Sequence, residues 1–106
     1  MTPEESNPCR IEKPRGALTF WIIYDKPTDF PDGFVLRPQF VCLRPVDAEK
    51  YGIVTEKHES GSITVASKLA WYAKDPEMLR AILPGHCVNL GRQPDDDKAI
   101  KEVWME

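Results

Sequence analysis

The stretch ALTFWIIYDKPTDFPDGFVLRPQFVCLR, residues 17–44, contains two apolar segments that are separated by a short run rich in aspartate and proline. The first segment, residues 17–24, is a continuous run of aromatic and β-branched residues, which predicts a strand buried on both faces. The second segment, residues 34–44, alternates with a period of two and predicts another strand. Because Pro38 has no backbone N–H to donate, we expect this strand to lie at a sheet edge or to be bulged there.

The connecting run YDKPTDFPDG, residues 24–33, is either a binding loop or a turn. Its two prolines fix φ, its aspartates accept hydrogen bonds from nearby amides, and Asp-Gly is a turn-closing pair. The alternating ligand pattern of a calcium loop is absent, so we predict no metal here. We interpret the run as a turn and keep its three aspartates as candidate binding residues: Asp25, Asp29 and Asp32.

The middle of the chain predicts a hairpin. Residues 45–61 are polar at both ends, and only Tyr51, Ile53 and Val54 suggest a short strand. Residues 62–71 alternate between apolar and smaller or polar side chains, which is typical of a strand. The sequence Glu-Ser-Gly-Ser before them predicts a turn that pairs residues 53–58 with residues 62–68.

A short helix is predicted next, in the sequence DPEMLRAILPG. Asp75 is a good N-cap, Pro76 suits the first helical position, Glu77 favours the positive end of the helix dipole, and Pro-Gly ends the helix. The expected buried stripe consists of Met78, Leu79, Ile82 and Leu83.

The last part of the chain predicts one strand and one ambiguous segment. Residues 86–92 are a plausible strand, with Val88 and Leu90 on one face. Residues 97–105 can form a helix capped by the preceding aspartates or a final strand, and we favour the strand because Ile, Val and Trp are β-formers. The aspartates and the tryptophan of this segment are further candidate binding residues: Asp95, Asp96, Asp97 and Trp104.

These elements predict an α+β domain with a mostly antiparallel sheet of about four to five strands and one short helix packed on one face. Residues 1–16 contain three prolines and show no apolar periodicity, which predicts a flexible N-terminal arm outside the core. We therefore expect a single domain over residues 17–106, since a chain of 106 residues is too short for two cores.

Composition excludes several classes of function. The 14 basic and 17 acidic side chains give a net charge of −3 without a charged block, so nucleic-acid binding is not favoured. No apolar run approaches the roughly 20 residues of a membrane span. The polar N-terminus is unlike a secretory signal, and three widely spaced cysteines do not form a disulfide framework, which predicts a cytoplasmic protein with free thiols.

The cysteines and histidines provide the alternative hypothesis of a small metal-binding or thiol-dependent enzyme domain that uses Cys87, His86 and His58. No C-x-x-C or H-x-x-x-H pair is present, and neighbours on a strand point to opposite faces. Nucleotide-binding glycine loops and hydrolase motifs are also absent. We therefore predict no catalytic residue, metal or cofactor, and buried cysteines acting as small apolar side chains.

The pieces FWIIYDKPTDFPDGFVLR and DDDKAIKEVWM resemble a family of small uncharacterised bacterial and phage-associated proteins. The shared features are an aromatic-rich first strand, a Tyr-Asp-x-Pro loop and a terminal Glu-Val-Trp. The family has no assigned activity, so the resemblance implies a recurring scaffold that includes Asp25, Pro27, Asp29, Pro31 and Trp104.

We therefore expect a small non-catalytic protein-interaction or regulatory protein, encoded on a phage or mobile element. An inhibitor of a host defence system, such as an anti-CRISPR protein, is one member of this class. The expected partner is another protein, and the sequence does not define the oligomeric state.

Overall fold

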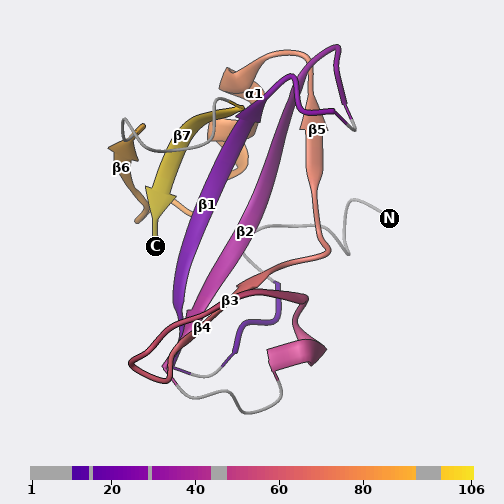
Figure 1. The fold of residues 1–106 in the computed structure, drawn as a ribbon. Helices are drawn as coiled ribbons and strands as arrows, with labels where there is room; N and C mark the ends of the chain where they lie inside the picture. The colour runs from indigo at the N-terminus through magenta and orange to yellow at the C-terminus, as the bar shows by residue number, and fades with distance from the viewer. Residues whose placement is uncertain (1–10, 15, 29, 44–47, 93–98) are drawn as a thin grey trace.

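A computed structural model describes residues 11–14, 16–28, 30–43, 48–92 and 99–106. In these residues the elements are, in chain order, β1 (Leu18–Asp25), β2 (Phe34–Cys42), the 3₁₀ helix η2 (Ala48–Lys50), β3 (Ile53–Lys57), β4 (Ile63–Ala66), β5 (Trp71–Ala73), α1 (Pro76–Ile82), β6 (Val88–Gly91) and β7 (Ile100–Met105). The strands form a single antiparallel sheet in the order β3-β4-β2-β1-β7-β6, and β5 also pairs with β2. Figure 1 shows β1 and β2 as the two long central strands.

The predicted α+β class is confirmed, but the sheet has seven strands and not four to five. One reason is that residues 62–71, predicted as one strand, form two. β4 pairs with the C-terminal half of β2 and β5 with its N-terminal half, and residues 67–70 lie between them. The predicted strands at 86–92 and 97–105 are β6 and β7, which extend the sheet beyond β1.

Pro38 lies in the middle of a central strand, so the prediction of an edge position is wrong. In the register of β1 and β2, Pro38 is opposite Trp21. The carbonyl of Pro38 accepts a hydrogen bond from the Ser67 amide at 3.1 Å, and in an antiparallel strand the N and C=O of one residue point to the same side. The nitrogen of Pro38 therefore faces the break between β4 and β5, where no ladder donor is needed.

The predicted hairpin is confirmed as β3 and β4, which pair from Ile53 opposite Ala66 to Lys57 opposite Ile63. Its turn is closed by a hydrogen bond from the His58 amide to the Ser62 carbonyl. Gly61 has a φ of +91°, a conformation that glycine adopts without the steric cost of a Cβ atom.

The helix α1 begins as the sequence predicts, with Asp75 as N-cap accepting a hydrogen bond from the Glu77 amide at 2.9 Å. The predicted buried stripe is only partly correct. Leu79 is buried, whereas Met78 is 63% exposed and Ile82 is also exposed. The helix has seven residues and rests on β2 and β5 through one side, so Met78 points away from the sheet.

The sheet has two faces, because side chains alternate along each strand. The helix-side face carries the buried clusters, which contain Trp21, Ile23, Leu36 and Leu79 near the helix, and Phe40, Cys42, Ile63 and Val65 near the hairpin. The indole of Trp21 donates a hydrogen bond to the Glu106 carboxylate at 3.1 Å. We call the other face the open face.

The N-terminal segment is closer to the core than predicted. Ile11 packs against both buried clusters, and Pro14 is buried. Lys13 forms an ion pair with Glu106. The expectation that residues 1–16 stay out of the core is therefore wrong for residues 11–14, while residues 1–10 and 15 lie outside the described residues.

No helix in the described part of the chain has the length and apolar character needed to cross a membrane.

Candidate functional site

The open face is the side of the sheet on which no described α-helix packs. The only α-helix in the described residues packs on the opposite face, where Leu79 contacts the cluster of Trp21 and Leu36. At one end of the open face, the loop after β1 contributes Pro27, and Phe30 contacts Tyr72 edge to face at 5.0 Å. The rest of this face is only partly open, since Ile22, Val35 and Thr64 on it are 6%, 0% and 7% exposed.

The open face is largely apolar. The strand registers place its side chains as follows: Leu18, Phe20, Ile22 and Tyr24 on β1; Val35, Arg37, Gln39 and Val41 on β2; Ile53 and Glu56 on β3; Thr64 and Ala66 on β4; Tyr72 on β5; Val88 on β6; and Ile100, Val103 and Met105 on β7. Leu18 is 49% exposed and Ile53 is 61% exposed. Between these two side chains, Phe20, Gln39, Val41 and Ala66 are half-buried.

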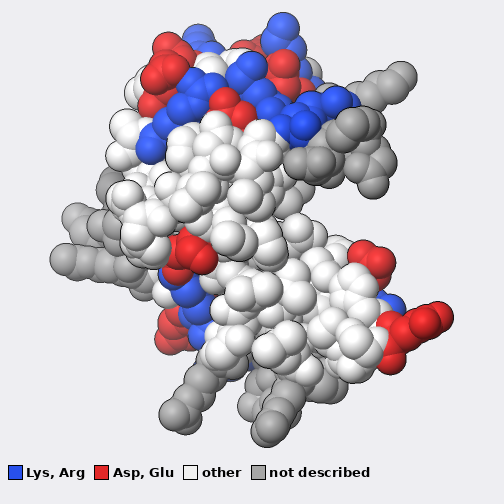
Figure 2. All heavy atoms as spheres, turned by 90° about the vertical axis from the view of Figure 1, so that its left-hand side faces the viewer, with Lys and Arg blue, Asp and Glu red and all other residues white. Residues whose placement is uncertain are grey.

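Charged side chains are concentrated away from the centre of this side of the molecule. Figure 2 views the side that carries β6 and β7: Lys, Arg, Asp and Glu gather at the top, further charged side chains lie at the left and at the right edge, and uncharged atoms lie between them. Of the open-face side chains on the paired strands, only Arg37 and Glu56 carry a charge.

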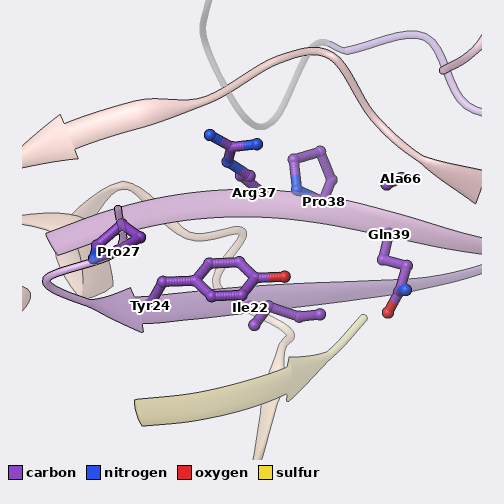
Figure 3. A pocket seen from close by; sticks show the side chains of 7 residues that line it. All are labelled: Ile22, Tyr24, Pro27, Arg37, Pro38, Gln39 and Ala66. Carbon is purple, nitrogen blue, oxygen red and sulfur yellow. The ribbon is translucent and has the colours of Figure 1, made fainter. Parts of the chain in front are cut away.

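Two hollows lie on the open face. The first, of about 230 Å³, is lined by Ile22, Tyr24, Pro27, Arg37, Pro38, Gln39 and Ala66. Figure 3 shows Tyr24 and Ile22 on β1 beside Arg37, Pro38 and Gln39 on β2. The second, of about 270 Å³, extends towards β7 and β3. Ile22 and Gln39 line both hollows, so the two lie side by side, and we call them together the depression.

The polar side chains that line the depression lie at different places in it. Arg37 and Tyr24 lie at the end near the loop after β1, and Gln39 lies at the centre. Glu56, whose side chain is 66% exposed, lies at the far corner on β3. The amide of Gln39 both donates and accepts hydrogen bonds.

The aspartates of the loop after β1 do not form a cluster in the described residues. Asp25 ends β1 and Asp32 is exposed in the turn, while Asp29 lies outside the described residues. The turn is closed by backbone hydrogen bonds, from the Phe30 amide to the Pro27 carbonyl at 2.9 Å and from the Lys26 amide to the Gly33 carbonyl at 2.8 Å.

The side chains of Asp25 and Asp32 make no recorded hydrogen bond that closes this turn. One carboxylate oxygen of Asp25 is buried without a hydrogen-bond partner. The expected bonds from the carboxylates to nearby amides are not seen for Asp25 or Asp32, so the loop is a turn held by its backbone.

Of the second group of candidate binding residues, only Trp104 lies within the described residues. Asp95, Asp96 and Asp97 lie outside the described residues. Trp104 is on β7 opposite Trp21, half-buried on the helix-side face, and its indole donates to the Glu102 carboxylate at 2.9 Å. This position is typical of a side chain that packs within the fold. A binding role for these residues stays a prediction.

The side chains of the alternative thiol or metal site are not brought together. His58 is next to the hairpin at one edge of the sheet, with its Nε2 2.9 Å from the Thr64 hydroxyl. His86 and Cys87 precede β6 at the other edge, and His86 is 4.0 Å from the Glu106 carboxylate. The described residues contain no group of three or more His, Cys, Asp or Glu side chains that could hold a metal ion. Burial raises the pKa of the Cys42 thiol.

Comparisons with models of known protein families, with curated protein sequences and with solved structures find no match to this chain. The resemblance to small phage-associated proteins therefore stays a prediction.

The open face was not identified from the sequence, although one signal pointed to it. The segment at residues 17–24 reads as a strand buried on both faces, and the described α-helix packs on the helix-side face only. On the open face, Ile22 is 6% exposed, whereas Leu18 is 49% exposed. A strand that is apolar on both faces, with a helix packed on one of them, indicates that the other face also packs against a partner.

Proposed function

We propose that this chain is a small non-catalytic interaction or regulatory protein that binds another protein through the open face of its sheet. The observation that carries the proposal is the central strand β1, which is apolar on both sides and has a described cover on one side only. Exposed apolar surface costs free energy in water, about 25 cal/mol per Å² of accessible area, so a face of this kind is stabilised by a partner.

The character of the open face fits a protein partner. An interface of this kind has an apolar centre with polar and charged groups at its rim. The open face has Phe20, Ile22 and Val41 near its centre, with Arg37 and Glu56 at two corners. The hollows beside Gln39 are of a size that accepts side chains of a partner.

The class includes inhibitors of host defence systems, such as anti-CRISPR proteins, which the family resemblance suggests. An inhibitor that acts by covering a surface of its target needs a docking face and no catalytic residues.

A comparison of two surface substitutions tests the proposal. Leu18→Lys places a charge on the open face, and Met78→Lys places the same charge at a site of similar exposure on α1, on the opposite side of the sheet. Tagged wild type and both variants are used to capture proteins from an extract of the source cells, and proteins other than the chain itself are identified by mass spectrometry.

We expect the wild type and Met78→Lys to capture the same protein, and Leu18→Lys to lose it while its melting temperature stays within a few degrees of the wild type. Equal capture by all three chains, or loss with Met78→Lys alone, would show that the binding surface lies elsewhere.

A further inference from the structure

We infer that a hollow beside the helix-side cluster around Phe40 binds a small organic phosphate. The hollow has a volume of about 370 Å³, and three segments that are distant in the sequence line it: the N-terminal segment, the turn from η2 into β3, and the link between β4 and β5. It shares no lining residue with the depression of the open face, so this site is separate from the surface proposed above.

Two irregular features of the sheet form walls of the hollow. The pairing with β2 is interrupted at residues 67–70, where the Ser67 hydroxyl accepts a hydrogen bond from the Leu69 amide at 3.1 Å. Gly52 approaches the end of β4 so closely that a Cβ atom would lie 2.1 Å from the Ala66 carbonyl oxygen. The break takes the link out of the strand pairing, and the glycine brings the start of β3 against it.

Part of the lining is apolar. Tyr51 packs edge to face on the buried Phe40, with 6.4 Å between the ring centroids, and Ile11 packs against the same cluster. Leu69 lines the hollow from the link between β4 and β5. Tyr51, Ile11 and Leu69 are half-buried, so each offers carbon surface to a ligand. This surface, in a hollow near the low end of the range of about 300–1,000 Å³ for small-molecule sites, fits a ligand with a small apolar body.

Two lysines line the same hollow from different segments. Lys50 ends η2, and Lys68 lies in the link between β4 and β5. Neither forms an ion pair with a described residue, and the Lys50 ammonium lies 5.6 Å from the centre of the Tyr51 ring. Two unpaired cations beside one hollow attract an anion, because each favours negative charge placed between them.

The charges select the kind of anion. A phosphate monoester carries roughly −1.5 to −2 charge at pH 7 and three acceptor oxygens, so a single group can satisfy both ammonium groups. Lysine binds phosphate as a point charge and does not need the planar geometry of an arginine and carboxylate pair. Glu12 adds one carboxylate on the wall formed by the N-terminal segment, which keeps the phosphate on the side of the lysines.

An NMR titration of the isotope-labelled full chain with phenyl phosphate tests the site. This probe combines the anionic group with one small ring. We expect saturable shifts of the Gly52, Lys68 and Leu69 amides with a dissociation constant of roughly 0.1–3 mM, and at least about tenfold weaker binding of inorganic phosphate and of phenol. Absence of a saturable shift at these amides up to about 20 mM, or an equal response to inorganic phosphate, would overturn the inference.

Substitutions of the three lining charges should give opposite signs. Lys50→Gln and Lys68→Gln should each weaken binding of phenyl phosphate about threefold to tenfold, because each removes one cation. Glu12→Gln should strengthen it about twofold, because it removes a like charge. Lys57→Gln, at an exposed site at the far end of β3, is the matched control and should leave the dissociation constant unchanged. An equal loss with Lys57→Gln would mean that binding follows net charge alone, and it would overturn the site.

A variant that keeps every charge tests the apolar lining. Leu69→Ala should weaken binding of phenyl phosphate about threefold to fivefold and leave the weaker binding of inorganic phosphate unchanged. Far-UV circular dichroism that matches the wild type shows that the variant is folded. Unchanged affinity of the folded Leu69→Ala chain for phenyl phosphate would contradict an organic ligand at this hollow.

Two further measurements define the ligand and the surface. Vesicles of phosphatidylcholine that contain phosphatidate should not co-sediment with the chain, and co-sedimentation that Lys68→Gln abolishes would assign the lysines to a lipid headgroup and overturn a free ligand. Leu18→Lys, on the open face, should bind phenyl phosphate as the wild type does. Loss of binding in that variant would place the ligand on the open face and would also overturn the inference.

Discussion

The guanidinium of Arg80 in α1 and the carboxylate of Glu102 in β7 form a two-point ion pair across the helix-side face. The Arg80 Nε to Glu102 Oε1 distance is 2.9 Å, and Nη2 contacts the second oxygen. The Glu102 side chain is 13% exposed and also accepts a hydrogen bond from the Trp104 indole. This pair connects the helix to a strand near the other edge of the sheet.

Substitution of either partner should destabilise the fold. Arg80→Gln leaves a largely buried carboxylate with fewer donors, so we expect the free energy of unfolding to fall by about 1.5–3 kcal/mol. The double variant with Glu102→Gln should lose less than the sum of the two single losses. Urea unfolding provides the values, and Lys74→Gln, at an exposed site, is the control. Additive losses would mean that the two side chains act independently.

Stability should depend on pH through Glu102. Hydrogen bonds from Arg80 hold the pKa of Glu102 below its usual value of 4.5, although burial acts in the opposite direction. A lowered pKa in the folded state means that the pair contributes its full stability above about pH 4.5 and loses it as pH falls through the folded pKa. The stability difference between wild type and Glu102→Gln should be constant above about pH 5 and shrink below pH 4.5. A difference that does not change between pH 7 and pH 3 would refute this role.

Gly33 should not tolerate a side chain. A Cβ atom at this position would lie 2.6 Å from the Ala73 carbonyl oxygen and 2.6 Å from the Phe30 ring. Gly33→Ala should cost about 1–3 kcal/mol of stability, because the backbone of β5 must move. Gly85→Ala, where nothing lies within 4 Å, is the matched control and should change stability by less than about 0.5 kcal/mol. Equal melting temperatures for the two variants would contradict the close packing.

The parts of the fold that local chemistry determines could be predicted from the sequence. Asp75 caps α1 and the hairpin of β3 and β4 forms at its glycine turn, because both depend on residues a few positions apart. The position of Pro38 could not be predicted in this way. Its tolerance in a central strand depends on the break at residues 67–70, far along the chain.

The candidate site was less predictable than the fold. Which face of the sheet is covered depends on where α1 docks, and the period of the strands does not contain that information. The acidic residues are conspicuous in the sequence, yet neither Asp25 nor Asp32 lines the hollows of the open face. The sequence shows that β1 is apolar on both sides. This pattern indicates that both sides are buried, but it does not indicate which segment or partner covers each side.

The aspartates of the loop after β1 should be replaceable without loss of stability. Asp32 is exposed and accepts no bond from a neighbouring amide in the described structure, so Asp32→Ala should change stability by less than about 0.5 kcal/mol. Asp25→Asn removes a charge whose one oxygen is buried and unpaired, and it should be neutral or stabilising. Thermal melts measure both effects. If both variants fold normally but lose a captured partner, the loop has a binding role that its geometry does not reveal.

The N-terminal segment should contribute to stability through Ile11. This side chain packs on the two buried clusters of the helix-side face, one around Phe40 and one around Trp21, and therefore joins them. Ile11→Ala removes buried methyl groups, but the site is only partly buried, so we expect a loss of about 1–2 kcal/mol, less than for a fully buried isoleucine. Glu12→Ala, at the exposed neighbouring position, is the control and should be neutral. Urea unfolding compares the two, and an Ile11→Ala chain as stable as the control would return residues 11–14 to the predicted flexible arm.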